Sequence, residues 1–243
     1  MNLSSKNLSF SSGMLYYYYL LSPAEQNAYR TLVAGIQAYS REIPIALKSN
    51  DQARIKRVIT AVHRDRPELF YIDFRFYRKK PRVPLASIRF DYLYSPAEIQ
   101  AIERVLADFW HGLKSKVNLA KNIKTKYRII ALEIGKTIKY RAQELCDYSV
   151  AGPMRNKCGA CESVSKLMVH ICRQAGIPAA LVVAKCRGNV HSWVKVWVKN
   201  KVRFIDIVEI QVCPFFFQLF PCFILIPEWL AKLVGYREIS QGG

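Results

Sequence analysis

The sequence predicts an α+β fold, in which amphipathic helices pack against antiparallel strands. Two kinds of pattern support this prediction. Several stretches repeat apolar residues at helical spacing behind capping residues, and other runs alternate apolar and polar residues with the two-residue period of a strand. The chain has 243 residues, of which 51% are apolar, so it is long enough and apolar enough to bury a core.

We divide the chain into a mobile tail (1–13), an N-terminal region of helices and a small sheet (14–118) and a C-terminal core (119–243). The N-terminal region opens with Ser22-Pro23-Ala24-Glu25, a capping serine followed by proline in the first turn and glutamate, and its helix is expected to reach about Glu42. The other elements predicted before residue 140 are a helix over 51–64 capped by Asn50 or Asp51, strands over 69–78 and 85–94, a helix over 96–114 behind a second S-P-A-E signature, and a helix over 119–139.

The run from Lys157 to Ser165, K-C-G-A-C-E-S-V-S, marks the point where a loop of small residues becomes an amphipathic helix. Gly176 and Pro178 end this helix. Cys161 therefore lies at a helix N-terminus, where unpaired N–H groups and the helix dipole favour the nucleophilic thiolate. The apolar stripe that defines the helix consists of Val164, Leu167, Met168, Ile171 and Ala175.

A nucleophilic thiol needs a base and a group that orients the base, and a predicted strand pair supplies both. His191 opens the run H-S-W-V-K-V-W-V, whose valines alternate with larger or polar residues as in a strand. A second strand is predicted over 202–208. Lys199 and Asn200 form a two-residue turn between the strands, because Asn tolerates the positive φ that such turns demand.

This register makes His191 and Asp206 diagonal neighbours. Trp193 lies opposite Asp206 on the face that carries His191, which puts the backbones of His191 and Asp206 roughly 7–8 Å apart. The sequence separations are 30 residues from Cys161 to His191 (191 − 161) and 15 from His191 to Asp206 (206 − 191). A carboxylate at this place can hold the imidazole in one tautomer while the other ring nitrogen faces the thiol.

These segments resemble the transglutaminase-like superfamily. The matching runs are G-A-C-E-S-V-S-K-L-M with the following R-Q-A-G-I-P, then H-S-W-V-K-V, then V-R-F-I-D-I, and together they cover about 123–208. In that family a Cys at a helix N-terminus is followed by an H-x-W strand and then by an Asp strand. Upstream, L-S-P-A-E-Q-N-A-Y and R-D-R-P-E-L-F-Y are similar to the N-terminal part of bacterial members.

The resemblance implies a papain-like transglutaminase core over 119–243, with the nucleophile's helix packed on an antiparallel sheet. It implies that Cys161, His191 and Asp206 catalyse acyl transfer from an amide through a thioester, with transamidation, deamidation or peptide hydrolysis as the outcome. Trp193 and Glu162 are the predicted substrate-binding residues.

The chain departs from its relatives at two places. It has Ser163 and Val164 where relatives often have an aromatic residue, and Val208 and Glu209 where they often have Thr and Trp. These differences fall on the substrate pocket and the oxyanion donors and leave the three catalytic residue types in place.

Two alternatives concern the pair Cys158 and Cys161. Its C-x-x-C spacing occurs in zinc sites, but a structural zinc takes four ligands, usually from two such pairs. The sequence has no second pair, although His170 and Cys172 are near. A reversible disulfide between Cys158 and Cys161 would switch the nucleophile off. We expect no metal and no cofactor.

The net charge of +19, from 37 basic and 18 acidic residues, predicts attraction to an acidic partner. We therefore expect a protein or peptide substrate of acidic character. Nucleic acid is the less favoured partner, because no nucleic-acid-binding motif accompanies the charge. The alternative class is a basic binding protein whose catalytic residues have decayed. Basic residues gather in two groups: Arg75, Arg78, Lys79, Lys80 and Arg82, and then Lys114, Lys116, Lys121, Lys124, Lys126 and Arg128.

The seven cysteines form no disulfide framework, and no cleavable signal is recognisable, so the expected location is cytoplasmic. The Ser-rich start leaves export by a specialised secretion system as the alternative. The uncharged segment 210–227 is interrupted by Pro214 and Pro221, whereas a spanning helix needs ~20 mostly apolar residues. It is predicted to be a buried strand pair or an apolar docking segment, with a membrane-associated hairpin as the alternative.

Overall fold

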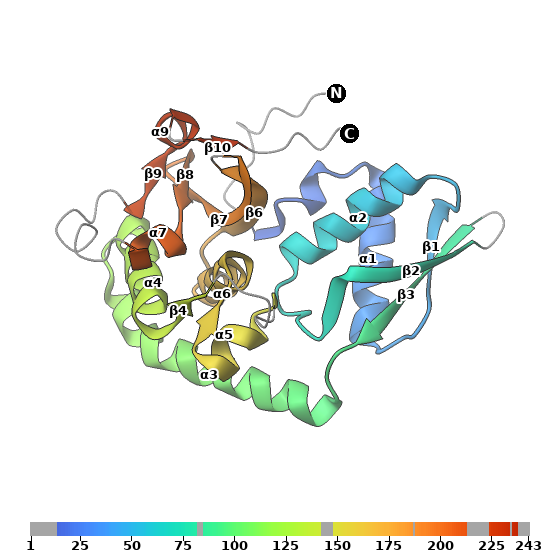
Figure 1. Ribbon diagram of the computed structural model, residues 1–243, viewed down its shortest axis with the longest axis horizontal. Helices are drawn as coiled ribbons and strands as arrows, with labels where there is room; N and C mark the ends of the chain where they lie inside the picture. The colour runs from blue at the N-terminus through green and yellow to red at the C-terminus, as the bar shows by residue number, and fades with distance from the viewer. Residues whose placement is uncertain are drawn as a thin grey trace. The chain divides into compact units, whose positions relative to one another are not determined.

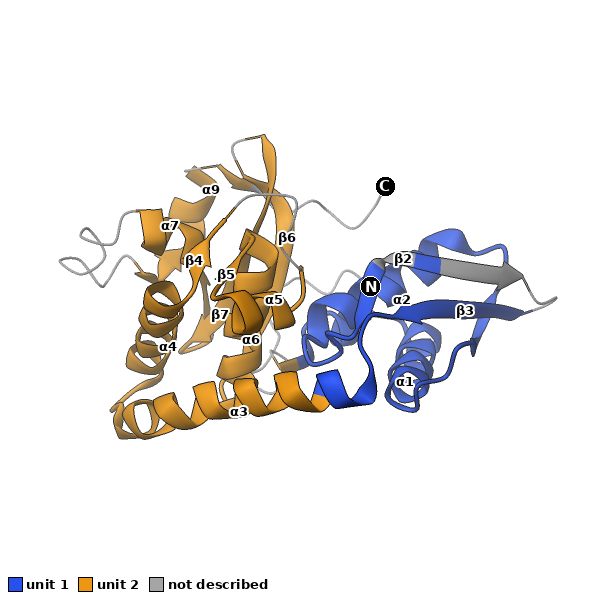
Figure 2. Cartoon of the chain, turned by 60° about the horizontal axis from the view of Figure 1, so that its bottom comes forward, with its two compact units in different colours: residues 1–7, 15–99 blue, residues 8–14, 100–243 orange. Residues whose placement is uncertain are grey.

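The computed structural model describes residues 14–81, 85–141, 148–186, 188–212, 224–233 and 235–237, so the predicted tail over 1–13 lies outside it. The chain forms two compact units, residues 15–99 and residues 100–243 (Figure 2). Both combine helices with antiparallel strands, which confirms the predicted α+β class. The units divide near the start of helix α3 (Pro96–Leu119), whereas the domain boundary predicted at 118/119 lies at the other end of that helix.

The first unit combines two helices with a three-stranded antiparallel sheet of order β1-β3-β2 (Figure 1). A short 3-10 turn, η2 (Tyr18–Leu20), precedes the first helix. The elements that follow it are α1 (Pro23–Gln37), β1 (Ile43–Lys48), α2 (Gln52–Asp65), β2 (Ile72–Pro81) and β3 (Leu85–Tyr92).

The predicted helix starts are confirmed by their capping hydrogen bonds. The Ser22 backbone N–H donates to the Glu25 carboxylate at 2.9 Å, and the Asp51 carboxylate accepts the Arg54 N–H at 3.2 Å. The same arrangement recurs at Ser95, whose N–H donates to the glutamate three residues on at 2.8 Å. These caps satisfy backbone donors that the first helical turn leaves without a partner.

The first helix is shorter than predicted. It ends at Gln37 rather than near Glu42, and Tyr39 follows with a positive φ of 55°. The residues after it form β1, a strand that the sequence analysis missed because Pro44 interrupts its run. β1 is an edge strand of its sheet, and proline is tolerated at sheet edges.

The second unit is built on a five-stranded antiparallel sheet of order β10-β6-β7-β8-β9. Its strands are β6 (Ala179–Cys186), β7 (Asn189–Val198), β8 (Lys201–Ile205), β9 (Ile226–Pro227) and β10 (Tyr236–Arg237). Helix α6 (Cys161–Gln174) packs against β6 and β7 (Figure 1), as predicted for the nucleophile's helix.

The remaining elements of this unit surround α6 and the sheet. They are α4 (Ile123–Thr137), α5 (Ala151–Asn156), α7 (Ile207–Val212) and α9 (Glu228–Leu233), together with the short parallel pair β4 (Lys139–Tyr140) and β5 (Cys158–Gly159). Within the described ranges, no helix is both long and apolar enough to cross a membrane.

The predicted hairpin is confirmed. Lys199 and Asn200 both have positive φ, 49° and 60°, as a two-residue turn of this type requires. The strands pair in the predicted register, with Val194 opposite Ile205. On the other side of β7, the run A-A-L-V-V-A-K-C forms β6 and pairs with β7 along all of its eight residues. Residues on both faces of this strand are buried from Ala179 to Val182, which explains its nearly continuous apolar character.

One prediction downstream of the turn is wrong. The strand predicted over 202–208 stops at Ile205, and α7 begins at Ile207, because Asp206 caps that helix instead of continuing the strand. Of the segment 210–227, predicted to be a buried strand pair or an apolar docking segment, residues 210–212 belong to α7 and 226–227 form the edge strand β9, and the prediction for the rest of the segment stays a prediction. Residues 213–223 lie outside the described part of the chain.

Candidate active site

Cys161 is the first residue of α6. Ala160 precedes it in an extended conformation (φ −73°, ψ 168°), and its carbonyl accepts the Val164 N–H at 3.1 Å as the first hydrogen bond of the helix. A methyl side chain at position 160 cannot cap the N–H groups of the first turn. The partly exposed Cys161 side chain therefore lies at a helix N-terminus without a side-chain cap, where the helix dipole favours negative charge.

Small residues before Cys161 let the chain approach α6 closely. A Cβ atom on Gly159 would lie 2.5 Å from Ser163 Oγ and 3.0 Å from Pro153 Cγ, which is closer than side chains tolerate. The Ser163 hydroxyl in turn donates to the Ala160 carbonyl at 3.0 Å. A larger side chain at position 159 would displace the backbone that leads to the thiol, so the glycine of the G-A-C run is explained by packing.

The His191 ring contacts both of its predicted partners. Its Nε2 is 2.6 Å from Oδ2 of Asp206, and the ring also forms a hydrogen bond with the Cys161 side chain. Because Nε2 is engaged with the carboxylate, Nδ1 is the nitrogen available to the thiol. The Ser165 hydroxyl donates to the Ser192 carbonyl at 3.2 Å and so fastens α6 to β7 next to His191. The structure thus brings together the three residues predicted as catalytic.

The charges around His191 favour its protonated form. Burial opposes the positive charge, but the hydrogen bonds to Asp206 and Cys161, together with the negative charge on each, outweigh burial and raise the pKa of His191 to about 10. Only 18% of the His191 side chain is exposed, so water screens these interactions weakly. At neutral pH the ring is therefore an imidazolium, ready to donate a proton.

Asp206 accepts four hydrogen bonds. Oδ1 accepts the backbone N–H groups of Val208 at 2.9 Å and Glu209 at 3.3 Å, and both bonds cap α7. Oδ2 is shared by His191 at 2.6 Å and by the Tyr236 hydroxyl, which donates at 2.8 Å. Only 2% of Asp206 is exposed, and a buried carboxylate needs such partners. These hydrogen bonds therefore fix the orientation of the Asp206 carboxylate.

Trp193 lies behind the His–Asp pair as part of the core. It is 1% exposed and pairs with Val182 across the β6–β7 ladder. Its ring meets Tyr236 edge-on with centroids 4.8 Å apart, and the His191 ring lies 6.0 Å away. Within the described chain, its buried indole N–H has no acceptor. A role for Trp193 in substrate binding stays a prediction, and its observed contacts are with the residues that support His191.

Glu162, the other predicted substrate-binding residue, forms an ion pair one turn along α6. Its carboxylate lies 2.7 Å from Nζ of Lys166, whose side chain is only 8% exposed. Lys166 also donates to the Tyr148 carbonyl at 2.9 Å, which ties the segment before α5 to the nucleophile's helix. This pair neutralises the charge of Glu162 next to Cys161, and contact of Glu162 with substrate stays a prediction.

Gln211 connects the aspartate side of the site to the cysteine side. It lies on α7, which Asp206 caps, and its amide N–H donates to the Ile138 carbonyl while its amide oxygen accepts the Tyr140 N–H at 2.5 Å. Tyr140 belongs to β4, which pairs in parallel with β5, the strand that ends two residues before Cys161. One side chain thus links the helix of the carboxylate to the strand that leads into the thiol.

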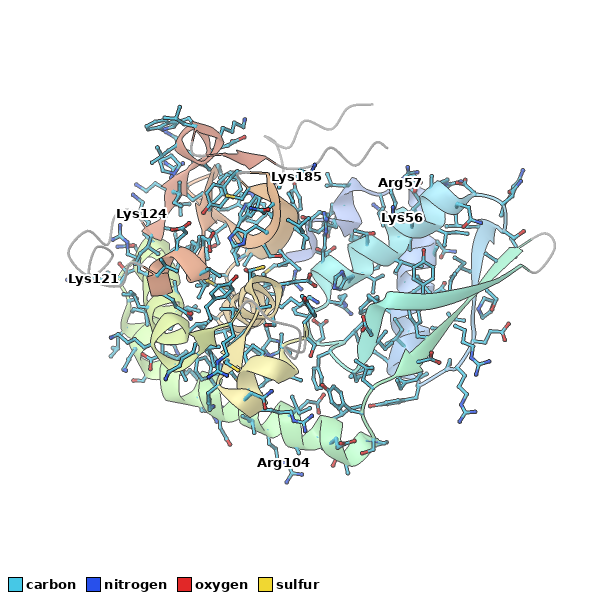
Figure 3. All side chains as sticks on the ribbon, in the orientation of Figure 1. Lys56, Arg57, Arg104, Lys121, Lys124 and Lys185 are labelled. Carbon is cyan, nitrogen blue, oxygen red and sulfur yellow. The ribbon has the colours of Figure 1, made fainter. Side chains whose placement is uncertain are left out.

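Part of the second predicted basic group lines an open cavity of about 570 Å³ in the same unit. Lys121, Lys126 and Lys199 line it, and none of the described residues that line it is acidic. Figure 3 labels Lys121 and Lys124 beside α4. Cys161, His191 and Asp206 do not line this cavity. The side chains of the first basic group, Arg75, Arg78, Lys79, Lys80 and Arg82, lie outside the described part of the chain.

No set of three His, Cys, Asp or Glu side chains in the described residues is arranged to hold a metal ion. No disulfide joins Cys158 and Cys161, the pair considered for zinc or for a disulfide, and Cys172 and Cys186 are in no disulfide either.

Sequence reasoning missed three residues that support the site: Tyr236, Gln211 and Ser165. Ser165 lies one turn after Cys161 on the face that meets the sheet, so helical spacing could have found it. Tyr236 and Gln211 have no sequence signal, because they contact residues 30 and 71 to 73 positions away and stand in no motif.

Comparison with known proteins supports the predicted resemblance. Residues 112–206 match the family model of the transglutaminase-like superfamily, whose members are generally enzymes, and this segment contains Cys161, His191 and Asp206. The chain is also similar to a crystal structure of a TGase, at 13% sequence identity and a TM-score of 0.40. That alignment covers 54% of this chain and 43% of the other, so the chain spans less than half of that protein. None of the curated proteins matches the chain.

Proposed function

We propose that the chain catalyses cysteine-dependent acyl transfer from an amide, with Cys161 as nucleophile, His191 as proton donor and acceptor, and Asp206 as the group that orients His191. The observation that supports this most is the continuous hydrogen-bonded chain from Cys161 through His191 to Asp206, with 2.6 Å between ring and carboxylate. We also propose that the core over 119–243 has the papain-like arrangement.

In the proposed resting state the proton lies on His191 and the negative charge on Cys161. The Cys161 sulfur attacks the amide carbonyl carbon, a C–S bond forms, and the carbonyl electron pair moves to oxygen. When the tetrahedral intermediate collapses, the C–N bond breaks and His191 gives its proton to the leaving amine. The product is a thioester on Cys161 beside a neutral imidazole.

The second half of the reaction reverses these roles. Neutral His191 takes a proton from water or from an amine, and that nucleophile attacks the thioester carbon. The C–S bond breaks and restores the negative sulfur beside the imidazolium. Water as acceptor gives hydrolysis or deamidation, and an amine gives transamidation. Through both steps Asp206 keeps Nε2 protonated, so that Nδ1 is the nitrogen that exchanges the proton with the reacting groups.

The backbone N–H of Cys161 is the proposed donor to the oxyanion. It belongs to the first turn of α6, which has no side-chain cap, and the positive end of the helix dipole lies there. Such a fixed donor stabilises charge that develops only in the transition state.

The proposed substrate is a protein or peptide of acidic character, since the chain carries a net charge of +19. The rival function is a basic binding protein, and the cavity lined by Lys121, Lys126 and Lys199 is the observation that favours it. A binding protein would not require the hydrogen-bonded arrangement of Asp206, His191 and Cys161, in which the carboxylate orients the imidazole next to the thiol. We therefore favour the enzyme.

The test is selective alkylation. We expect iodoacetamide near neutral pH to label Cys161 far faster than Cys172, because burial raises the pKa of the Cys172 thiol far above its usual value and keeps it out of reach. Intact-mass spectrometry followed by peptide mapping measures both rates, with Cys161→Ala as the control that removes the fast phase. Equal labelling of the two cysteines in the folded protein would refute the proposal.

A further inference from the structure

Tyr236 lies outside the matched segment 112–206 and contacts the site from the C-terminal strand β10. β10 pairs with β6, where Tyr236 lies opposite Cys186. The Tyr236 ring is 5% exposed and packs in one apolar cluster with Trp193 and with Phe204 of β8. Its hydroxyl donates to Oδ2 of Asp206 at 2.8 Å, the same oxygen that His191 contacts at 2.6 Å.

We propose that Tyr236 is a positioning residue of this site, which fixes the Asp206 carboxylate and sets the strength of its hydrogen bond to His191. The inference rests on the proposed function. It assigns part of the active site to the C-terminal strand, so that the matched segment by itself is an incomplete site.

Geometry explains why the hydroxyl has this effect. Asp206 could rotate about its Cβ–Cγ bond if only one oxygen were held, but Oδ1 caps α7 and Oδ2 accepts from both His191 and Tyr236. Each of two donors to one carboxylate oxygen weakens the hydrogen bond of the other. The Tyr236 hydroxyl therefore weakens the hydrogen bond between Asp206 Oδ2 and the His191 N–H. Edge-on packing against Trp193 holds the tyrosine ring in place.

The hydroxyl remains a donor throughout the working pH range. Burial first, and then the charge and hydrogen bond of Asp206, raise the pKa of Tyr236 far above its usual value. The other titratable groups that face Tyr236 are Glu209 of α7 and Cys186 of β6, and those that face His191 are Asp206 and Cys161.

The test compares Tyr236→Phe with Tyr127→Phe. Tyr127 is a matched control in the same unit: it is fully buried, and its hydroxyl donates to the Pro178 carbonyl at 2.6 Å and contacts none of the three catalytic residues in the structure. Both variants lose the hydrogen bonding of one buried tyrosine hydroxyl, which in Tyr127 also reaches the Trp197 carbonyl at 3.5 Å, so both should melt at a lower temperature. A merely structural role for Tyr236 would make them alike in every other measurement.

The first readout is NMR of protein with ¹⁵N-labelled histidine. In Tyr236→Phe we expect the His191 Nε2–H proton to move downfield, because Asp206 Oδ2 then serves a single donor. Tyr127→Phe should leave this resonance in place. The second readout is the pH dependence of Cys161 alkylation: in Tyr236→Phe the stronger bond from Asp206 favours the His191 imidazolium, so the alkaline limb of the profile should move to higher pH, whereas Tyr127→Phe should leave the profile unchanged.

Site-specific incorporation of 3-fluorotyrosine at position 236 keeps the ring and the hydroxyl but makes the hydroxyl a stronger donor, so the His191 proton should move upfield. This measurement applies even if Tyr236→Phe does not fold. A His191 resonance that neither replacement moves would overturn the inference. Because NMR reads the bond between Asp206 and His191 directly, failure of this inference is distinguishable from failure of the proposed function, which shows as unselective labelling of wild-type Cys161.

Discussion

Each unit of the molecule buries an aspartate, and the two residues differ in what surrounds them. Asp65, at the end of α2 in the first unit, is 0% exposed and accepts the backbone N–H groups of Tyr17 and Tyr18 at 3.1 and 2.7 Å. Asp206, in the second unit, also accepts two backbone N–H groups, but its other oxygen binds His191 and Tyr236.

The difference shows that burial and hydrogen bonding of a carboxylate do not by themselves make a site. Asp65 holds the turn before α1 onto α2, which is a contribution to folding. Asp206 makes a similar contribution at α7 and in addition determines the charge of an imidazole beside a thiol. The role proposed for Asp206 therefore follows from its bond to His191, and matched substitutions in the two units can separate that role from a contribution to folding.

The largest effect is expected for His191→Ala. This variant removes the proton donor and the positive charge beside Cys161, so acyl transfer should fall by about 10²–10⁴-fold. The fast labelling of Cys161 should slow toward the rate of an ordinary exposed thiol. Kinetics of iodoacetamide labelling, with circular dichroism to verify folding, measure this. Labelling at the wild-type rate would mean that another group activates the thiol.

Asp206→Asn and Asp65→Asn test the comparison directly. An amide at position 206 presents either an N–H to the His191 N–H or a weaker acceptor, so acyl transfer should fall by about 10²-fold or more. Asp65→Asn should lower the free energy of unfolding by about 1–3 kcal/mol and leave Cys161 labelling unchanged. Urea unfolding and labelling kinetics on both variants are the measurements. If Asp65→Asn slowed labelling in the folded protein, the two carboxylates would not be separable.

Gln211→Ala has a matched control in Gln26→Ala. Gln26 in the first unit also donates from its amide to backbone carbonyls, those of Tyr18 at 3.3 Å and Leu21 at 3.2 Å. Each variant loses side-chain hydrogen bonds worth about 1 kcal/mol each in stability. Only Gln211→Ala should also reduce Cys161 labelling, by a few-fold, because it releases the link between α7 and β4. Equal labelling in the two variants would show that this link does not position the thiol.

The last prediction concerns the pH dependence of stability that His191 contributes. The folded pKa of His191, about 10, lies above the ordinary value of 6.5, so folding favours the protonated ring. The stabilisation is complete below pH 6.5 and is lost as pH rises from 6.5 through about 10. The difference in unfolding free energy between wild type and His191→Gln should shrink over this interval. A difference that grew with pH would contradict the assigned charge state.

Local patterns predicted the parts of the site that lie within one element or one turn. The helix that begins at Cys161 follows from its apolar stripe and its end signals, and the hairpin register follows from Lys199 and Asn200. The contact between His191 and Asp206 was predicted from that register and is present. The strand predicted beyond Ile205 was wrong, because alternation of apolar residues cannot reveal that an aspartate side chain caps a helix.

The sequence by itself determined a thiol at a helix N-terminus, a histidine on a neighbouring strand and an aspartate within reach of it. These depend on backbone preferences and side-chain periodicity, which act over a few residues. Only the tertiary structure decided that Tyr236 shares Asp206 with His191 and that Gln211 joins α7 to β4. Contacts across 30 and 71 positions arise when β10 docks on β6 and α7 docks on β4, and packing of distant segments leaves no periodic signal along the chain.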